Sequence, residues 1–166
     1  MKIGTRILHT GNEIDQATGA VSIPVYHAST FKQPGVDEFG PYDYGRSGNP
    51  TRDALEGVIA SLEVGTAGFA FSSGIAAISS TFLMFSPGDH LVVCEDVYGG
   101  TYRALTKLFS RFGIEATFVD FTDPAKVKAA VKSNTRAVYA ETPSNPLLKI
   151  TDLRAIAAVA KENGLL

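Results

Sequence analysis

The sequence is poor in cysteine and contains no long apolar segment. Cys94 is the single cysteine among 166 residues, so a disulfide within the chain is excluded. It stands in the apolar run Leu91–Cys94, which favours a packed core thiol over a reactive one. No apolar run is long enough to cross a bilayer, and the first residues lack the apolar core and cleavage site of a secretory signal. We therefore expect a cytoplasmic protein with no membrane partner.

An excess of charge of one sign is also lacking. The formal net charge is −2, which gives no electrostatic reason to expect a nucleic acid or an anionic surface as partner. The three histidines, His9, His27 and His90, show no metal-ligand spacing and have no partner cysteines, so no metal site is predicted. With 45% hydrophobic and 19% charged residues, the composition is that of an ordinary soluble globular domain.

Three common site motifs are absent: the Gly-Lys-Ser/Thr of a Walker loop, the Gly-x-Gly-x-x-Gly of a dinucleotide site and a nucleophile elbow. What is present is an apolar stretch at residues 67–85. We expect a short buried strand at 68–71 and a helix from Gly74 onward, joined by Ser72 and Ser73. A strand that turns directly into a helix leaves N–H groups that bind anions. A serine-capped turn without a ligand is the alternative, and these residues alone do not choose between the two.

Residues 1–48 differ from the rest of the chain. Glycines and prolines interrupt them repeatedly, and no helical periodicity is sustained. Aromatic residues nevertheless recur, at Tyr26, Phe31, Phe39, Tyr42 and Tyr44. A segment this rich in aromatics is unlike a disordered tail. We expect an extended, ordered arm that lies against its own domain or another subunit.

From residue 49 onward, helix and strand patterns alternate. A side-chain cap at Asn49 and a proline at position 50 predict the start of a helix. Its buried stripe should be Leu55, Val58, Ile59 and Leu62. Short apolar strands are predicted at 90–94, 115–119 and 137–140, separated by helices, with Asp123 and Thr151 as the caps of the last two. This order is typical of an α/β fold with a mostly parallel, doubly wound sheet.

Three polar features follow predicted strands. They are the turn at Ser73-Gly74, the glycine-flanked Tyr98 and the double-proline segment Glu141–Asn145. Ligands of parallel sheets bind beyond the carboxyl ends of the strands, so these features should converge there. Taken singly, each has an ordinary explanation: a capped turn, a packed loop aromatic and a plain rigid turn.

Four segments in this order resemble the trans-sulfuration family of fold-type I pyridoxal-phosphate enzymes, the cystathionine lyases and synthases. They are YDYGRSGNPT at 42–51, SGIAA at 73–77, DVYGGT at 96–101 and ETPSNP at 141–146. The resemblance covers the whole chain. It implies an incomplete large domain of the aspartate-aminotransferase type at 49–166, preceded by an arm at 1–48 that contributes to a neighbouring subunit.

The resemblance implies pyridoxal 5′-phosphate as cofactor. Gly74 and Ile75 would offer backbone N–H groups to its phosphate, and Ser73 lies at the same turn. Tyr98 would stack on the pyridine ring and help to move protons, which makes it the catalytic residue expected in this chain. The bound cofactor would act as an electron sink when the substrate loses its α-proton.

The remaining roles are implied in the same way. Asn145 would lie near the phenolic oxygen of the cofactor and the substrate, and Glu141 would brace that site. Tyr44 and Arg46 would reach the phosphate in a neighbouring subunit's site. The active site would then be shared within a dimer, and the family is usually a tetramer made of two such dimers.

The family's Schiff-base lysine and the aspartate that holds the ring nitrogen protonated would lie beyond Leu166. We therefore expect the N-terminal part of such an enzyme, inactive alone. The expected substrate is cystathionine or a related sulfur amino acid, cleaved by β- or γ-elimination. Gly100 stands where methionine γ-lyases carry a cysteine, which disfavours that specialisation. Alternatives are γ-replacement by a cystathionine γ-synthase or homoserine-ester sulfhydrylase and, in another class, a non-catalytic α/β phosphate-binding module.

Overall fold

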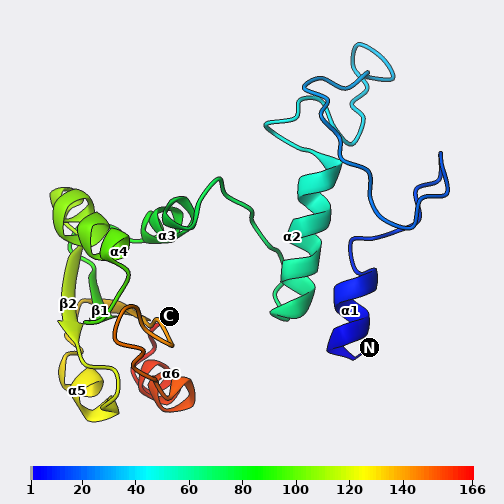
Figure 1. Cartoon of the computed structure of the whole chain (residues 1–166). Helices are drawn as coiled ribbons and strands as arrows, with labels where there is room; N and C mark the ends of the chain where they lie inside the picture. The colour runs from blue at the N-terminus through cyan, green and yellow to red at the C-terminus, as the bar shows by residue number, and fades with distance from the viewer. Residues whose placement is uncertain (1) are drawn as a thin grey trace. The chain divides into compact units, whose positions relative to one another are not determined.

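A computed structural model describes residues 2–166, which form two compact units that divide between Phe71 and Ser72. Figure 1 labels α1 to α6, β1 and β2. The first unit contains α1 (Ile3–His9) and α2 (Pro50–Leu62). The second unit contains, in order, α3 (Gly74–Phe82), β1 (His90–Cys94), α4 (Gly99–Arg103), the π-helix η1 (Ala104–Leu108), the 3-10 helix η2 (Phe109–Phe112), β2 (Glu115–Val119), α5 (Pro124–Ala129), β3 (Thr135–Tyr139) and α6 (Leu153–Glu162).

The second unit is built on a three-stranded parallel sheet in the order β2-β1-β3. All five residues of the central strand β1 are buried. Because successive side chains of a strand point to opposite faces, both faces of the sheet are covered. The predicted α/β fold with a parallel sheet is therefore confirmed. Strands β1 and β2 have the predicted bounds, and β3 begins two residues before the predicted 137.

Aromatic contacts attach two helices to one face of this sheet. The Phe82 ring of α3 lies 5.5 Å from the Tyr139 ring of β3, and the Tyr102 ring of α4 lies 5.0 Å from the Phe118 ring of β2, between centroids. Val93 of β1 is the register partner of both Phe118 and Tyr139, so α3 and α4 share a face. Helices α5 and α6 pack on each other and add Val127, Ile156 and Val159 to the same core.

In the first unit, α2 begins where the sequence predicts. The Asn49 side chain accepts a hydrogen bond from the Thr51 N–H (2.9 Å), and Pro50 is the first helical residue. Helix α1, in contrast, was not expected in a segment without sustained periodicity. It packs against α2, and Arg6 donates to the Ser61 carbonyl (2.6 Å). These contacts stabilise a helix too short to be stable alone.

The strand predicted at residues 68–71 is wrong. No strand among residues 2–166 pairs with this segment, and the Phe69 and Phe71 side chains are 78% and 47% exposed. An apolar run becomes a strand only where a neighbour satisfies its backbone groups. Residues 2–166 provide no such paired neighbour for this segment.

The buried stripe predicted for α2 is also wrong. Of the residues of α2, all described by the structure, none is buried. Leu55 and Ile59 are 53% and 47% exposed. The apolar spacing is helical, as predicted, but the other helix of this unit is the short α1, which is too small to cover it.

The cap predicted for the last helix is displaced by one residue. The carboxylate of Asp152, rather than the Thr151 hydroxyl, accepts the N–H groups of Arg154 (3.0 Å) and Ala155 (3.1 Å). Thr151 is instead buried, with its N–H donating to the Thr142 hydroxyl (3.0 Å). A carboxylate one position along the chain is an equally good cap. The sequence pattern alone therefore does not decide whether Thr151 or Asp152 caps the helix.

Candidate functional site

The strand order creates a topological switch between β1 and β3. The chain leaves β1 toward β2 on one side and returns to β3 on the other. Leu166 lies outside β3, where its N–H donates to the Arg136 carbonyl (2.9 Å). Open α/β sheets bind ligands at such switch points, beyond the carboxyl ends of the strands. The residues after β1 and after β3 are therefore the expected ligand-binding residues.

Glu141, two residues after β3, connects these two strand ends. Its carboxylate accepts hydrogen bonds from the Tyr98 backbone N–H (2.8 Å), the Tyr139 hydroxyl (3.2 Å) and the Thr101 hydroxyl (3.3 Å). Its own N–H donates to Sγ of Cys94 at the end of β1 (3.3 Å). Because a carboxylate with three donors is firmly held, the start of α4 is fixed to the end of β3.

Two groups around Glu141 are held in their protonated forms. Burial raises the pKa of Tyr139 to about 12, and the nearby Glu141 carboxylate adds to the increase. Burial likewise raises the pKa of the Cys94 thiol. Tyr139 therefore acts as a hydrogen-bond donor at neutral pH, and Cys94 is the packed core thiol that the sequence predicted.

Tyr98 combines a fixed backbone with an accessible ring. The side chain is 46% exposed, while Glu141 holds its backbone N–H. The ring lies over Gly100, since a Cβ atom at residue 100 would overlap its Cε1 atom. A flat aromatic face presented in this way can stack on a planar ligand. Gly100 therefore helps to determine where the ring lies.

The N-terminus of α3 is the predicted turn. The extended Ser73 caps the helix, with its Oγ accepting from the Ala76 N–H (3.2 Å). The N–H groups of Gly74 and Ile75 belong to the first turn, where a helix offers no internal acceptor. A Cβ atom added at Gly74 would meet no atom of residues 2–166 within 4 Å. The turn is thus both capped by serine and open to an anion.

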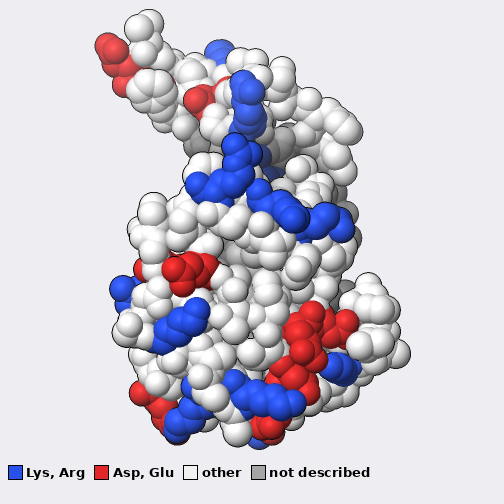
Figure 2. Space-filling model, turned by 90° about the vertical axis from the view of Figure 1, so that its left-hand side faces the viewer, with Lys and Arg blue, Asp and Glu red and all other residues white. Residues whose placement is uncertain are grey.

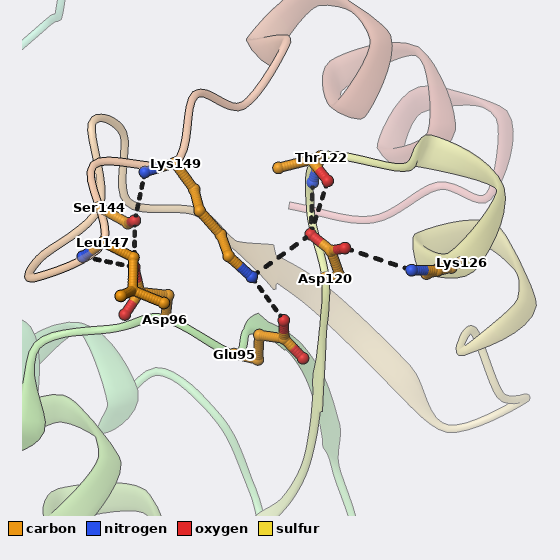
Figure 3. Close-up of polar contacts among 8 residues, drawn as sticks. All are labelled: Glu95, Asp96, Asp120, Thr122, Lys126, Ser144, Leu147 and Lys149. Atoms are coloured by element: carbon orange, nitrogen blue, oxygen red, sulfur yellow. Dashed lines mark hydrogen bonds and ion pairs between the residues drawn. The ribbon is translucent and has the colours of Figure 1, made fainter.

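Asn145 is exposed on the loop between β3 and α6. The preceding residue, Ser144, is buried and donates its hydroxyl hydrogen to the carboxylate of Asp96, which follows β1 (Figure 3). The loop that carries Asn145 is thereby attached to the segment that carries Tyr98. This brings a third predicted site residue to the same edge of the sheet.

Tyr44 and Arg46 lie in the first unit. Cζ of Arg46 lies 5.1 Å from the centroid of the Tyr44 ring, a cation–π contact between two exposed side chains. Tyr44 also forms an antiparallel bridge with Thr30, and the Phe31 N–H donates to the Asp43 carbonyl (2.9 Å). These contacts give the segment local structure, and both its role as an ordered arm and the reach of these side chains to a phosphate stay predictions.

The predicted site residues of the second unit are therefore connected. Tyr98 and Glu141 are joined directly, and α3, which begins with Gly74, packs against α4, which follows Tyr98. Sequence reasoning missed the support provided by Thr101 and Tyr139. A signal was present, because Thr101 lies in the same glycine-rich segment as Tyr98, and Tyr139 lies in the strand predicted at 137–140, close to Glu141 in the sequence.

The charged side chains and the helices bear on two further features, metal sites and membrane spans. Figure 2 shows Lys and Arg interspersed with Asp and Glu over the lower part of the visible face. Residues 2–166 contain no group of three or more His, Cys, Asp or Glu side chains that could hold a metal ion. Within the same range, no helix has both the length and the apolar character needed to span a membrane.

Comparison with known proteins places the chain among relatives of more than twice its length. Cystathionine β-lyase MetC of Bacillus subtilis (strain 168) is 59% identical over 162 residues, which is 98% of this chain and 42% of that protein. Cystathionine γ-lyase of the same strain is 52% identical over 166 residues, which is 100% of this chain and 44% of that protein. The crystal structure of cystathionine γ-lyase from Lactobacillus plantarum complexed with L-serine has a TM-score of 0.92 at 51% identity, covering 100% of this chain and 43% of that one.

The match to a family is equally extensive. The family described as Cys/Met metabolism PLP-dependent enzyme matches residues 4–166. Pyridoxal phosphate is therefore the expected cofactor, in agreement with the sequence motifs and with the open turn and exposed aromatic ring in the structure. The chain belongs to the pyridoxal-phosphate-dependent enzymes of cysteine and methionine metabolism.

Proposed function

We propose that the protein containing this chain is a pyridoxal-phosphate-dependent carbon–sulfur lyase that acts on cystathionine or a related sulfur amino acid. The chain spans 42–44% of the length of the lyases compared above, so the activity belongs to the longer protein. The observation that carries the proposal is the hydrogen bond between the Glu141 carboxylate and the Tyr98 N–H, which we call the Glu141 junction. It fixes Tyr98 with its ring exposed at the switch point of the sheet. The 59% and 52% identities to two cystathionine lyases support this substrate class.

The residues present fit the cofactor. A phosphate needs donors in open space, and the first turn of α3 offers the N–H groups of Gly74 and Ile75 at a position without a side chain. A planar ring needs an accessible aromatic face, and Tyr98 offers one. When bound, pyridoxal phosphate supplies an electron sink for the negative charge that develops when the substrate loses its α-proton.

The chain's own residues then have separable tasks. Gly74, Ile75 and Ser73 bind the phosphate, and Tyr98 orients the ring and holds or moves a proton at its hydroxyl. Glu141 fixes the Tyr98 backbone, and Asn145 offers an amide that can donate to an oxygen of the cofactor or the substrate. Each task needs a fixed position more than a reactive side chain.

The same proposal includes the first part of the chain and the assembly. We expect residues 1–48 to form an arm that contributes to a neighbouring subunit and 49–166 to belong to the cofactor-binding domain. Tyr44 and Arg46 would then complete the phosphate site of that neighbour, where a guanidinium suits a doubly charged anion. The expected assembly is a dimer of dimers in the cytoplasm.

Incubation of the full-length protein with pyridoxal phosphate and cystathionine tests the proposal. With one water consumed, β-elimination releases pyruvate, ammonia and homocysteine, whereas γ-elimination releases 2-oxobutyrate, ammonia and cysteine, so the products identify the regiochemistry. A parallel assay with an activated homoserine ester and a thiol detects γ-replacement. Formation of a thioether without release of a 2-oxo acid would replace the lyase proposal by a synthase. Binding of phosphate without any of these reactions would indicate a non-catalytic module.

A further inference from the structure

The loop that carries Asn145 closes on itself between Ser144 and Lys149. The Ser144 N–H donates to the Lys149 carbonyl (3.0 Å), and the Lys149 N–H donates to the Ser144 hydroxyl oxygen (2.9 Å). The Leu148 N–H donates to the Ser144 carbonyl (3.1 Å). Leu148 has φ +53°, a region that leucine rarely adopts. The loop therefore has a defined shape, and Ser144 is the residue through which it is held.

Asp96 attaches this closed loop to the end of β1 (Figure 3). Its Oδ2 atom accepts hydrogen bonds from the Ser144 hydroxyl and from the Leu147 N–H (3.2 Å). Asp96 lies two residues before Tyr98, and Ser144 directly precedes Asn145. The Asp96 carboxylate thus links the backbone next to Tyr98 with the backbone next to Asn145, the two proposed ligand-binding residues.

Lys149 supplies a second attachment of the same loop. Its Nζ lies 2.8 Å from Oε1 of Glu95, after β1, and 4.0 Å from Oδ1 of Asp120, after β2. The hydrogen bond with Glu95 raises the pKa of Lys149. These side chains are partly exposed, and such ion pairs contribute little. The contact of Asp96 with the buried Ser144 is therefore the stronger attachment.

We infer that Asp96 is a positioning residue, which sets where the Asn145 amide lies relative to the Tyr98 ring through its hydrogen bonds to Ser144 and Leu147. The inference rests on the proposed function, because Asn145 and Tyr98 are its proposed ligand-binding residues. Asp96 itself does not need to touch the cofactor. Its carboxylate can accept both hydrogen bonds at once, and its negative charge strengthens each of them.

The test compares Asp96→Ala and Asp96→Asn with wild type in the full-length protein. We expect Asp96→Ala to weaken pyridoxal phosphate binding and to raise the KM for cystathionine, each about tenfold, the factor expected when a hydrogen bond to a charged group is lost. The value of kcat should change less than KM. Asp96→Asn keeps one acceptor oxygen, so its cofactor affinity and its KM should lie between those of wild type and Asp96→Ala. Glu162→Gln is the control, because its carboxylate meets only the exposed Lys128 among residues 2–166.

Hydrogen exchange of the protein without cofactor provides a readout that does not depend on activity. The amides of Leu147, Leu148 and Lys149 should exchange faster in Asp96→Ala than in wild type. Ser144→Ala should also speed exchange, most of all at Lys149, whose N–H loses its acceptor. The effect of the double variant should be smaller than the sum of the two single effects, because both substitutions remove the contact between Ser144 and Asp96.

The outcomes separate the two proposals. Unchanged cofactor affinity, unchanged KM and unchanged loop exchange in Asp96→Ala would overturn the positioning role. A lower melting temperature with normal affinity and KM would also overturn it, because the role would then be structural only. If Asp96→Ala does not fold, Asp96→Asn and Ser144→Ala carry the test. If the wild-type protein binds no cofactor, the proposed function fails, while faster loop exchange would still support the Asp96 attachment.

Discussion

The two units of this chain bury the apolar side chains of their helices and strands to different extents. In the second unit, Leu91, Val92 and Phe82 are at most 1% exposed, and the sheet is covered on both faces. In the first unit, Leu55 and Ile59 of α2 are about half exposed. The second unit therefore completes a core from its own residues, whereas the first leaves its apolar surface uncovered within the described chain.

The polar contacts follow the same division. In the second unit, Tyr98, Glu141 and the loop at Ser144 are held by hydrogen bonds within the unit. In the first, Tyr44 and Arg46 contact each other and remain exposed. The comparison indicates that hydrogen bonds within the second unit hold the part of the proposed site that lies there. The arm, as proposed, obtains its role from a neighbouring subunit.

The largest expected effect contrasts the two apolar surfaces. Phe82→Ala removes a buried ring that packs on Phe109 and Tyr139, and should lower the free energy of unfolding by about 3–5 kcal/mol. Chemical denaturation of the full-length protein measures the change. The loss should not depend on protein concentration, because the two aromatic rings that it packs on lie in its own unit.

Ile59→Ala is the matched variant in the first unit. The loss in free energy of unfolding that it causes should rise with protein concentration, because a neighbouring subunit is proposed to cover the exposed apolar face of α2. A concentration-independent cost as large as that of Phe82→Ala would remove the contrast between the units.

The next effect concerns the Glu141 junction. Glu141→Ala leaves three donors without their acceptor, and the lost hydrogen bonds to a charged group should cost about 2–3 kcal/mol in the affinity for pyridoxal phosphate. Glu141→Gln keeps one acceptor oxygen and should lose less. Titration with the cofactor, followed by absorbance, measures both. Equal affinities in wild type and Glu141→Ala would show that the fixed Tyr98 backbone is not needed.

Arg46→Ala tests the proposed contribution of the first unit. Removal of one guanidinium from the phosphate should weaken cofactor retention about tenfold in the assembled protein. Lys32→Ala, which removes the same charge from another exposed position of this unit, should have no effect. Cofactor loss on dialysis provides the measurement, and equal retention in the two variants would rule out a shared site.

His90 predicts a pH dependence that belongs to the second unit. Its ring nitrogens lie 2.8 Å from the hydroxyls of Thr135 and Thr117, and burial lowers its pKa, with Lys132 adding to the decrease. At pH values between the two pKa values of His90, the unfolded chain therefore binds a proton on this ring that the folded chain does not bind. Stability should be constant above the unfolded pKa near 6.5 and fall below it, by at most about 1.4 kcal/mol per pH unit for this group.

Denaturation at several pH values compares wild type with His90→Asn and His27→Asn. The His90 variant should lose this part of the pH dependence, and the variant of the exposed His27 should keep it. Identical profiles for wild type and His90→Asn would contradict the assignment.

The smallest effect is expected from the ion pair between α5 and α6. Lys128 and Glu162 have side chains that are 62% and 59% exposed, so Lys128→Ala should cost less than about 1 kcal/mol, and less still at high salt. Denaturation in low and high salt checks this. A cost that survives high salt would show that the helices depend on the pair more than their exposure suggests.

Local signals in the sequence were sufficient for most of the second unit. The apolar run at 90–94 predicted β1 because a central parallel strand is buried on both faces. The turn at Ser73-Gly74 was predicted from its small residues, and Ser73 is the cap. Tyr98 and Glu141 were predicted to meet from strand-end geometry, and they do.

Features that depend on distant partners could not be predicted in the same way. The segment 68–71 has the pattern of a strand but no pairing neighbour among the described residues. Helix α1 is held by α2 and by Arg6 on Ser61, contacts that no local pattern encodes. The support of Glu141 by Thr101 likewise joins positions 40 residues apart in the chain.

The most direct test of this account is a crystal structure of the full-length protein with pyridoxal phosphate. We predict that the phosphate lies within hydrogen-bonding distance of the Gly74 and Ile75 N–H groups and that the pyridine ring stacks on Tyr98. A cofactor bound elsewhere, with the turn of α3 facing only solvent, would contradict it.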